Sequence, residues 1–430
     1  MNKPAATNYR WVICALLFFA TTINYIDRQV IGLLKPTLEA AFHWTESDYG
    51  KIVTAFATCY ALGYVIFGGF IDRIGSKLGY TISIVVWSIA AILHAVVNTT
   101  LGFGIVRSLL GLGEGGNFPA AVKSTAEWFP KKERALATGI FNSGTSVGAV
   151  VAPVMVPWIL GIYGWRPAFL ITGAIGFIWL VLWLLFYEIP SRHKKLSKAE
   201  FEYIHSDDEA ETDEDATKQP IKWGKLLSIK QSWVFISAKA LTDPVWWFFL
   251  FWLPSYFSSV FHLDLKKPCL ELVVIYAATT VGSIGGGYLS SALIKKGWSV
   301  LKARKTALLI AAIAVLPILL VRYTNNIWVA VAIISLVTAA HQAWSSNIFT
   351  IVSDVVPKKA VSSVVGMGGM TGSLASALFP LLVGFLLDHY KALGNIGAGY
   401  NIIFIMCAMA YIISWLIIHR LTTTMKPLNL

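Results

Sequence analysis

The feature that most constrains this chain is a succession of long apolar stretches without a charged side chain. A helix that crosses the hydrocarbon core of a bilayer needs about 20 mainly apolar residues, so a chain of this length can hold about twelve crossings joined by short loops. Eleven such stretches occupy residues 11–26, 52–71, 79–106, 135–165, 167–187, 244–263, 272–294, 306–321, 323–353, 360–387 and 392–419. The pattern predicts an all-α integral membrane protein, since backbone polar groups in lipid must be paired within each helix.

A twelfth span is predicted over residues 101–128, although Arg107, Glu114 and Lys123 lie within it. Apolar and small residues fill the rest of this segment. The stretch 79–106 is too long for one helix, so the chain is expected to turn near Asn98. Twelve transmembrane helices result.

Composition excludes several classes of function. The chain is 56% hydrophobic and 13% charged, whereas soluble globular domains have about 25% charged residues. No sizeable soluble catalytic domain fits beside the spans, and neither a nucleophile with a base nor a set of metal ligands is visible. We therefore expect no enzyme, no metal and no bound cofactor. The net charge of +12 indicates membrane topology rather than a nucleic-acid partner, and the four scattered cysteines indicate no disulfide framework.

Lysine and arginine residues gather on one side of the predicted spans. With both termini cytoplasmic, the cytoplasmic segments carry 24 of the 35 Lys and Arg residues, the opposite side carries 7, and four lie within the membrane. Such a bias fixes the orientation. The first span follows Lys3 and Arg10 as a signal peptide would, but no small-residue cleavage site follows it, so we interpret it as an uncleaved anchor. The sequence predicts a multi-pass protein of the cell (inner) membrane.

The longest loop divides the chain into three parts. Residues 1–187 hold the first six spans, residues 188–230 form a cytoplasmic linker, and residues 231–430 hold the second six. In the linker, Ser197 and Glu200 have the spacing of a capping box before a short helix. The acidic stretch that follows is expected to be a disordered connection between the halves.

An internal repeat relates the two halves. EWFPKK at 127–132 recurs as DVVPKK at 354–359, an offset of 227. Gly139 with Gly366 and Pro153 with Pro380 keep this offset. The second and eighth spans show a weaker echo at an offset of 219, with Gly63 on Gly282 and Gly68 on Gly287. Repeats that run in the same direction predict two parallel six-helix halves around a central cavity.

A short basic turn is predicted between the second and third spans, where residues 68–77 read GGFIDRIGSK. An aspartate can lie at a helix terminus there and the basic residues can pair across the two halves, so that the turn latches one state. The alternative is an ordinary turn with cytoplasmic positive charge. Together with the repeat, the turn resembles the loop signature of the major facilitator superfamily. The motif is carried by Gly68, Asp72, Arg73, Gly75 and Lys77.

Longer segments resemble the anion:cation symporter branch of that superfamily. They are NYIDRQ at 24–29, RSLLGLGEGGNFPA at 107–120, residues 127–153 and AHQAWSSNIFTIVSDVVP at 340–357. Within the branch they are most similar to bacterial hexuronate transporters, which carry galacturonate or glucuronate. The resemblance implies a monomeric secondary active transporter that imports a sugar-acid anion with protons as the coupling ions, by alternating access. Alternatives of the same fold are an organic-anion exchanger and a hexonate or glucarate symporter; a multi-span enzyme and a channel are alternatives from other classes.

Besides Lys123, six charged side chains are predicted inside the spans, where each would cost roughly 2.5 to 3.5 kcal/mol if it faced lipid. They are therefore expected to face a cavity or each other. They are Asp27, Arg28, Arg107, Glu114, Lys239 and Asp243. Arg107 and Glu114, seven residues apart, share one helical stripe, and Lys239 and Asp243, four apart, can pair directly.

Two of these basic residues and two of the acids have proposed roles. A guanidinium binds a planar carboxylate through two hydrogen bonds, so Arg28 can clamp a substrate acid; its alternative is an interhelical ion pair. The resemblance implies the clamp, and it assigns proton coupling to Asp27 and Glu114 with Arg107 as counter-ion. Burial favours a neutral carboxylate and a nearby arginine favours a charged one, so such an acid can load and release a proton when its partner exchanges. The alternative is that both acids only neutralise the arginines.

The remaining candidates for substrate contact are aromatic and polar residues near mid-span. The resemblance assigns sugar-acid contacts to Tyr25 and Tyr60, which taken alone would be core or interface tyrosines. Lys239 with Trp246 is the candidate from the second half, and a plain Lys239–Asp243 pair is the alternative. Hydroxyl-binding groups, whose alternative is interhelical hydrogen bonding, are offered by Asn142, Thr145, His341, Gln342, Ser345 and Ser346.

Three further patterns qualify this interpretation. Where relatives carry an asparagine in the eleventh span, this chain has Gly369, which weakens inference about the distal end of the sugar. GLGEGG at 111–116 resembles a dinucleotide fingerprint but lies inside a predicted membrane helix, so its glycines are expected to permit close helix packing. His94 has no second ligand at metal spacing and receives no role.

Overall fold

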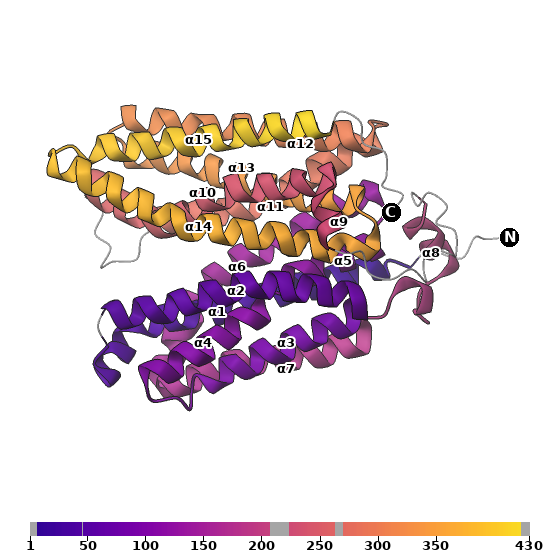
Figure 1. The fold of residues 1–430 in the computed structure, drawn as a ribbon, viewed down its shortest axis with the longest axis horizontal. Helices are drawn as coiled ribbons and strands as arrows, with labels where there is room; N and C mark the ends of the chain where they lie inside the picture. The colour runs from indigo at the N-terminus through magenta and orange to yellow at the C-terminus, as the bar shows by residue number, and fades with distance from the viewer. Residues whose placement is uncertain (1–6, 45, 207–222, 263–269, 423–430) are drawn as a thin grey trace.

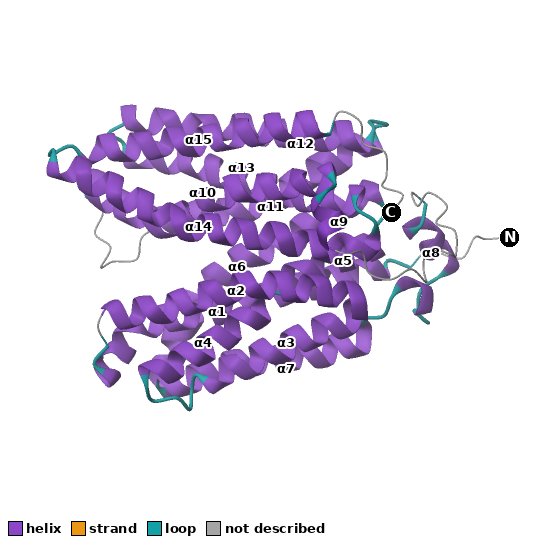
Figure 2. Ribbon diagram, in the orientation of Figure 1, coloured by secondary structure: helices purple, strands orange, loops and turns teal. Residues whose placement is uncertain are grey.

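The computed structural model describes residues 7–44, 46–206, 223–262 and 270–422, and all regular secondary structure in these ranges is helical (Figure 2). The acidic stretch 207–215 of the linker lies outside the described residues. The first half contains α1 (Tyr9–Phe42), α2 (Glu46–Ile74), α3 (Ser76–Leu93), α4 (Thr100–Glu114), α5 (Asn117–Trp128), α6 (Lys131–Tyr163) and α7 (Trp165–Phe186).

The second half follows a short linker. The linker holds η1 (Pro190–Arg192), α8 (Lys198–Ile204) and α9 (Trp223–Leu227). The second half contains α10 (Lys230–Phe261), α11 (Leu270–Lys295), α12 (Val300–Val315), η3 (Leu316–Tyr323), α13 (Ile327–Val355), η4 (Lys358–Ala360), α14 (Val361–Ala392) and α15 (Ile396–Leu421).

The helices account for the predicted spans. Within the described residues, ten helical segments are long and apolar enough to cross a membrane by themselves, the joined α12–η3 and η4–α14 segments among them. The two other predicted crossings are α4 with α5, the fourth, and α10, the seventh. The structure therefore contains a helical segment for each of the twelve predicted spans.

The fourth span differs from the single helix predicted over 101–128, because α4 ends at Glu114 and α5 begins at Asn117. The physical reason is a pair of glycines at tight contacts with neighbouring helices. A methyl group on Gly115 would lie 2.6 Å from the main chain of Gly63 in α2, and one on Gly116 would collide with Ser83 in α3. The break thus lets the span follow two neighbours closely, at the point where Glu114 enters the site.

The two halves form separate bundles that lie side by side (Figure 1). Helices α2 and α14 pack together between the halves, as do α6 and α11. The glycines that the repeat aligns lie at these two contacts. A methyl on Gly68 would lie 2.6 Å from the Ser362 carbonyl oxygen of α14, and one on Gly287 would collide with the main chain of Ala135 in α6. Small residues therefore allow the backbones of the two halves to approach.

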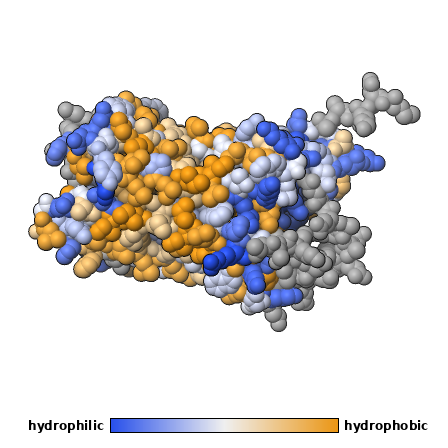
Figure 3. All heavy atoms as spheres, turned by 90° about the horizontal axis from the view of Figure 1, so that it is seen from above, coloured by the Kyte–Doolittle hydropathy of each residue, from blue (hydrophilic) through white to orange (hydrophobic). Residues whose placement is uncertain are grey.

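The outer surface carries an apolar band. In Figure 3 hydrophobic atoms cover the middle of the visible face, while hydrophilic atoms gather towards both ends. Large apolar side chains are exposed on the outer helices, among them Leu185, Val281 and Phe385. Exposure on this scale is unfavourable in water and ordinary in lipid, so the band marks the bilayer-facing surface.

The linker contacts the start of α1. Ser197 Oγ accepts a hydrogen bond from the Glu200 amide at 3.2 Å, as the predicted helix cap requires. The Glu200 carboxylate accepts the main-chain amides of Tyr9 at 3.0 Å and Arg10 at 3.1 Å, and it binds the Arg10 guanidinium at 2.9 Å. Glu200 thus caps the first turn of α1. We call the end of the molecule that holds α8 and the turn between α2 and α3 the linker end.

Candidate functional site

Asp72 joins the two halves at the linker end. One carboxylate oxygen accepts the Ser363 amide at 2.7 Å, and the other accepts the Ser362 amide at 3.3 Å and the Lys123 ammonium at 2.9 Å. Ser362 and Ser363 lie in the first turn of α14, so a side chain of the first half caps a helix of the second. This agrees with the expectation that Asp72 lies at a helix terminus.

The basic residues of the same turn do not pair across the halves, so that part of the expectation was wrong. Lys77 binds Glu188, at the end of α7 in its own half, at 3.0 Å. Arg73 is exposed and makes no ion pair with the described residues. Gly75 adopts φ 89°, which lets the chain turn sharply between α2 and α3.

A second cluster of charged residues at the linker end was not found by sequence reasoning. Arg134 in α6 binds Asp354 in α13 at 3.0 Å and donates to the Ser353 carbonyl at 2.6 Å. Arg304 in α12 binds the other oxygen of Asp354 at 3.0 Å and donates to the Lys131 carbonyl at 2.6 Å. The repeat offered a signal, because Asp354 is the acid of DVVPKK. With Asp72, this cluster holds the linker end closed in this structure.

Arg28 lies in α1 on the side of the helix that meets α2 and α4. Its Nε and Nη2 atoms both lie 2.9 Å from the same oxygen of Glu114, which is 0% exposed. The rings of Tyr25 and Tyr60 lie 4.6 and 4.3 Å from the guanidinium carbon. The aromatic walls and the single carboxylate oxygen fix the plane of the guanidinium.

Asp27 and Arg107 form a second, more deeply buried group behind Arg28. Asp27 is 2% exposed and Arg107 is 4% exposed. Neither oxygen of Asp27 has a hydrogen-bond partner among the described residues, and Glu114, Thr172 and Arg107 are the polar groups around it. Arg107 donates from Nη2 to the main-chain oxygen of Arg28 at 2.5 Å, while its Nε and Nη1 have no partner within the same residues.

This arrangement differs from two simple ion pairs. A buried charge without hydrogen bonds is costly, and here one oxygen of Glu114, both oxygens of Asp27 and two nitrogens of Arg107 lack such bonds in the described chain. The four predicted residues are therefore brought together, but their hydrogen-bonding capacity is only partly used. Sequence reasoning missed Asn24, whose Oδ1 accepts from Arg28 at 3.3 Å, and Phe56, whose ring lies 4.5 Å from the Arg107 guanidinium.

In the second half, Lys239 and Asp243 are paired on α10 at 2.7 Å, as their spacing allows. The Lys239 ammonium also lies 4.8 Å from the ring of Phe349 in α13. That ring stacks at 5.1 Å on Phe118 of α5, which belongs to the first half. The pair is thus placed next to the junction of the halves.

Trp246 and His341 lie face to face across α10 and α13, with ring centroids 5.1 Å apart and an interplanar angle of 4°. The His341 Nδ1 atom is hydrogen-bonded to the hydroxyl of Tyr411 in α15. This fixes the imidazole and leaves Trp246, which is half-buried, as the outer ring of the stack.

Most of the predicted hydroxyl-binding residues already bond to other protein groups in this conformation, both between helices and within one helix. Asn142 Nδ2 donates to Gln342 Oε1 at 2.9 Å and to Ser283 Oγ at 3.1 Å, which joins α6 to α13 and α11. Ser346 donates to the Ser283 and Gln342 carbonyls, and Thr145 donates to the Asn142 carbonyl at 2.9 Å. Ser345 differs, because its hydroxyl has no hydrogen bond to any described residue and it is only half-buried.

Tyr64 is a further residue that sequence reasoning missed. Its hydroxyl lies 3.2 Å from that of Tyr60. Its ring lies against Gly369 in α14, where a methyl group would collide with it. Gly369 therefore makes room for a tyrosine of the opposite half. The signal was the spacing, since Tyr60 and Tyr64 are four apart on one face of α2.

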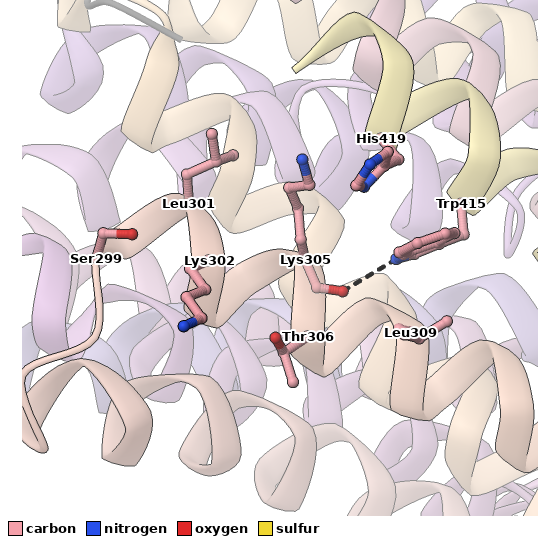
Figure 4. A pocket seen from close by; sticks show the side chains of 8 residues that line it. All are labelled: Ser299, Leu301, Lys302, Lys305, Thr306, Leu309, Trp415 and His419. Atoms are coloured by element: carbon pink, nitrogen blue, oxygen red, sulfur yellow. Dashed lines mark hydrogen bonds between the residues drawn. The ribbon is translucent and has the colours of Figure 1, made fainter. Parts of the chain in front are cut away.

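Features outside the predicted site are explained by packing or lie elsewhere. The glycines of GLGEGG permit close approach, since methyl groups on Gly111 and Gly113 would lie 2.5 and 2.7 Å from the main chains of α2 and α3. His94 Nδ1 donates to the Ala90 carbonyl at 2.7 Å, and the imidazole stacks on Phe169 at 4.9 Å. A cavity of about 350 Å³ lies between α12 and α15 and is lined by Lys302, Lys305, Trp415 and His419, so it contains none of the predicted residues (Figure 4).

Comparison with known proteins gives relatives over nearly the whole chain. The sequence profile of the family described as Major Facilitator Superfamily matches residues 17–380. The chain is 32% identical over 380 residues to a hexuronate transporter of Escherichia coli (strain K12), with 88% of each chain covered. It is 28% identical over 403 residues to a probable galactarate/D-glucarate transporter of the same organism, with 90% of each chain covered. The resemblance drawn from the motifs is confirmed.

A solved structure shows the same architecture. The proton:xylose symporter XylE, bound to 6-bromo-6-deoxy-D-glucose, superimposes with a TM-score of 0.75 at 16% identity, covering 96% of this chain and 97% of that one. At this identity the likeness concerns the fold alone. It confirms the predicted arrangement of helices.

Proposed function

This chain belongs to the Major Facilitator Superfamily, and from that membership we propose that it imports a hexuronate, such as galacturonate or glucuronate, together with protons. The protein would be a monomeric secondary transporter of the inner membrane, with both termini cytoplasmic, no bound cofactor and no enzymatic activity. Alternating access would open the linker end, closed in this structure, while the opposite end closes. The name of the hexuronate transporter relative supports the substrate class.

The observation that carries the proposal is the contact between Arg28 and Glu114. Both guanidinium nitrogens that face Glu114 bind one carboxylate oxygen, at 2.9 Å each. A substrate carboxylate offers two oxygens to the same fork and forms the better bidentate pair. Substrate and ionised Glu114 therefore compete for Arg28. A proton on Glu114 ends that competition, so proton binding and substrate binding favour each other.

Asp27 supplies a second proton site by a different route. Its oxygens lack hydrogen bonds among the described residues, and its polar neighbours include Arg107. Arg107 donates to the main-chain oxygen of Arg28, so a shift of Arg28 towards substrate alters the position of the counter-ion of Asp27. Tyr25 and Tyr60, which flank the guanidinium, would lie beside the sugar ring. Asn142, Gln342 and Ser346 would contact hydroxyls only after exchanging the bonds they now make with each other.

Two alternatives share this geometry. An organic-anion exchanger would use the same clamp and would differ in whether the empty carrier can return without substrate. A symporter of hexonates or of glucarate would place a different group at the distal end, and the galactarate/D-glucarate transporter relative supports that reading.

Uptake by proteoliposomes distinguishes these possibilities. Purified protein would be reconstituted and supplied with labelled glucuronate under an inward proton gradient, with unlabelled galacturonate, gluconate and glucarate as competitors. We expect uptake that a protonophore abolishes, and competition strongest from the hexuronates. Uptake that needs an anion inside the vesicles, regardless of the proton gradient, would instead establish exchange. Absence of competition by any sugar acid would refute the proposed substrate class.

A further inference from the structure

The second half brings one basic side chain to the site together with an acid that neutralises it. Lys239 is 8% exposed, and its ammonium lies 2.7 Å from the Asp243 carboxylate, whose side chain is 20% exposed. Among the six charged residues predicted inside the spans, Lys239 is the one cation contributed by the second half. The pair therefore decides what charge the second half presents to a substrate that Arg28 holds from the first half.

Several contacts place the pair beside the junction of the halves. A methyl group on Gly372 of α14 would collide with the Asp243 carboxylate, so Asp243 lies against α14. Tyr64 of α2 lies against Gly369, three residues before Gly372 on α14, and its hydroxyl lies 3.2 Å from that of Tyr60. The Tyr60 ring in turn lies 4.3 Å from the guanidinium carbon of Arg28. Tyr60 and Tyr64 of the first half thus connect Arg28 to the part of α14 that contacts Asp243.

We propose that Asp243 restricts this site to sugar acids with a single carboxylate and excludes aldaric acids, which carry a carboxylate at each end. The inference rests on the proposed function, because it takes Arg28 as the clamp for the first carboxylate. A six-carbon acid held at one end by Arg28 extends its other end towards the second half. In a hexuronate that end carries hydroxyl groups, which can donate to Asp243 while the Lys239 pair stays intact.

An aldaric acid meets a different surface at the same place. Its second carboxylate faces the carboxylate of Asp243, and like charges held together at a desolvated site repel strongly. Lys239 could bind the second carboxylate only by leaving Asp243, which would then lie half-buried without its counter-ion. Rejection of a competing ligand by an unfavourable charge is a common source of specificity. The ion pair would thus act as a filter against aldaric acids, because Lys239 is bound to Asp243 and cannot bind a second substrate carboxylate.

Removal of the negative charge should make Lys239 available. In the full-length purified protein, the inhibition constants of the diacids glucarate and galactarate would be measured against labelled glucuronate. Each constant would be divided by that of unlabelled glucuronate, a monoacid, to give a diacid-to-monoacid ratio. For Asp243→Asn we expect this ratio to fall by about tenfold or more, since a repulsive pair becomes an attractive one. The double variant Asp243→Asn, Lys239→Met should lose the gain, because no cation remains to bind the second carboxylate.

Matched controls separate charge from general disturbance. Asp243→Glu keeps the charge and should keep the exclusion of diacids. Glu39→Gln removes the acid of another lysine pair at the same spacing, Lys35–Glu39 at 3.2 Å on α1, and should leave the ratio unchanged. Where Asp243→Asn does not yield folded protein, Asp243→Ser removes the same charge and leaves a hydroxyl beside Lys239.

The outcomes distinguish this inference from the proposed function. A wild-type protein that binds no sugar acid would refute the proposed function. A wild-type protein that binds glucuronate, with the diacid ratio unchanged in folded Asp243→Asn or Asp243→Ser, would overturn the filter alone. A wild-type protein that takes glucarate as readily as glucuronate would overturn the filter directly, whatever the variants do.

Discussion

Replacement of Glu114 by glutamine tests how a proton is exchanged for a substrate. The variant keeps the shape of the side chain but removes the negative charge that holds Arg28. In the wild-type protein, a substrate carboxylate can occupy Arg28 only if Glu114 leaves the guanidinium or takes up a proton. In Glu114→Gln neither step is needed, so substrate binding should lose its dependence on one proton.

The structure sets the size of the effect. With nitrogen and oxygen 2.9 Å apart, Coulomb's law at an effective dielectric constant of about 20 gives roughly 6 kcal/mol for the pair as an upper bound. Protonation of Glu114 costs about 1.4 kcal/mol for each pH unit above its pKa. Protonation of Glu114 therefore costs less than breaking the ion pair up to about four pH units above the pKa of Glu114. The wild-type dissociation constant should rise about tenfold per pH unit for this proton, and the variant should lack that contribution.

Equilibrium binding of labelled glucuronate to the purified protein, across the neutral and alkaline range, measures this slope. Glu39→Gln serves as control, because it neutralises an acid of α1 that lies outside the site. We expect Glu114→Gln to bind more tightly than wild type at alkaline pH and to fail in accumulation against a gradient. If its dissociation constant rises with pH as steeply as that of wild type, Glu114 does not exchange a proton for the substrate.

Three further predictions address the clamp, the latch and the stoichiometry. Arg28→Lys should weaken substrate binding by about tenfold to a hundredfold in a folded protein, since the charge remains while the planar fork is lost; near-normal affinity in calorimetry would contradict the clamp. Asp72→Asn removes the charge that caps α14 and should increase the population open at the linker end, as seen in spin-label distances between α2 and α14, with substrate still bound; an unchanged distance distribution would show that Asp72 does not hold this state. With both Asp27 and Glu114 loaded, each cycle should carry one net positive charge inward, so an interior-negative potential at equal pH should drive accumulation by about 2.3 kcal/mol per 100 mV; no accumulation under that voltage would mean that one acid is only structural.

The fold was predictable because the apolar stretches and the repeat are properties of the chain alone. The spacing of Lys239 and Asp243 likewise gave their pairing, and the turn at 68–77 gave the position of Asp72 at a helix terminus. The break of the fourth span was not predictable, since it depends on how closely Gly115 and Gly116 meet α2 and α3. A helix interruption of this kind is set by tertiary contact and not by local propensity.

The site, like the fold, was predictable from the sequence only in part. Sequence reasoning grouped Asp27, Arg28, Arg107 and Glu114, because charged side chains inside membrane spans must face a cavity or one another. It could not tell that Glu114 pairs with Arg28, while Arg107 donates to the main-chain oxygen of Arg28 and leaves two nitrogens without a partner among the described residues. The seven-residue spacing placed Arg107 and Glu114 on one stripe without showing which neighbour each contacts. Tyr64 was missed because its partner in the other half is a glycine, so that its spacing from Tyr60 was the one signal and no side chain of the second half pointed to it.

The way the linker end is closed also bears on how this sequence can drift during evolution. Asp72 accepts main-chain amides of α14, and Arg134 and Arg304 donate to main-chain oxygens of Ser353 and Lys131. Every residue except proline supplies such an amide, and every residue supplies such an oxygen, whatever its side chain. For these hydrogen bonds selection therefore bears on four charged side chains, these three and Asp354, and not on the side chains of the residues whose main chain pairs with them. A saturation mutagenesis scan scored for transport should find intolerance at those four positions and tolerance at Lys131, whose half-buried side chain takes no part in the bond. Ser362 should remain sensitive for a different reason, because it is fully buried and its hydroxyl donates to the Pro119 carbonyl.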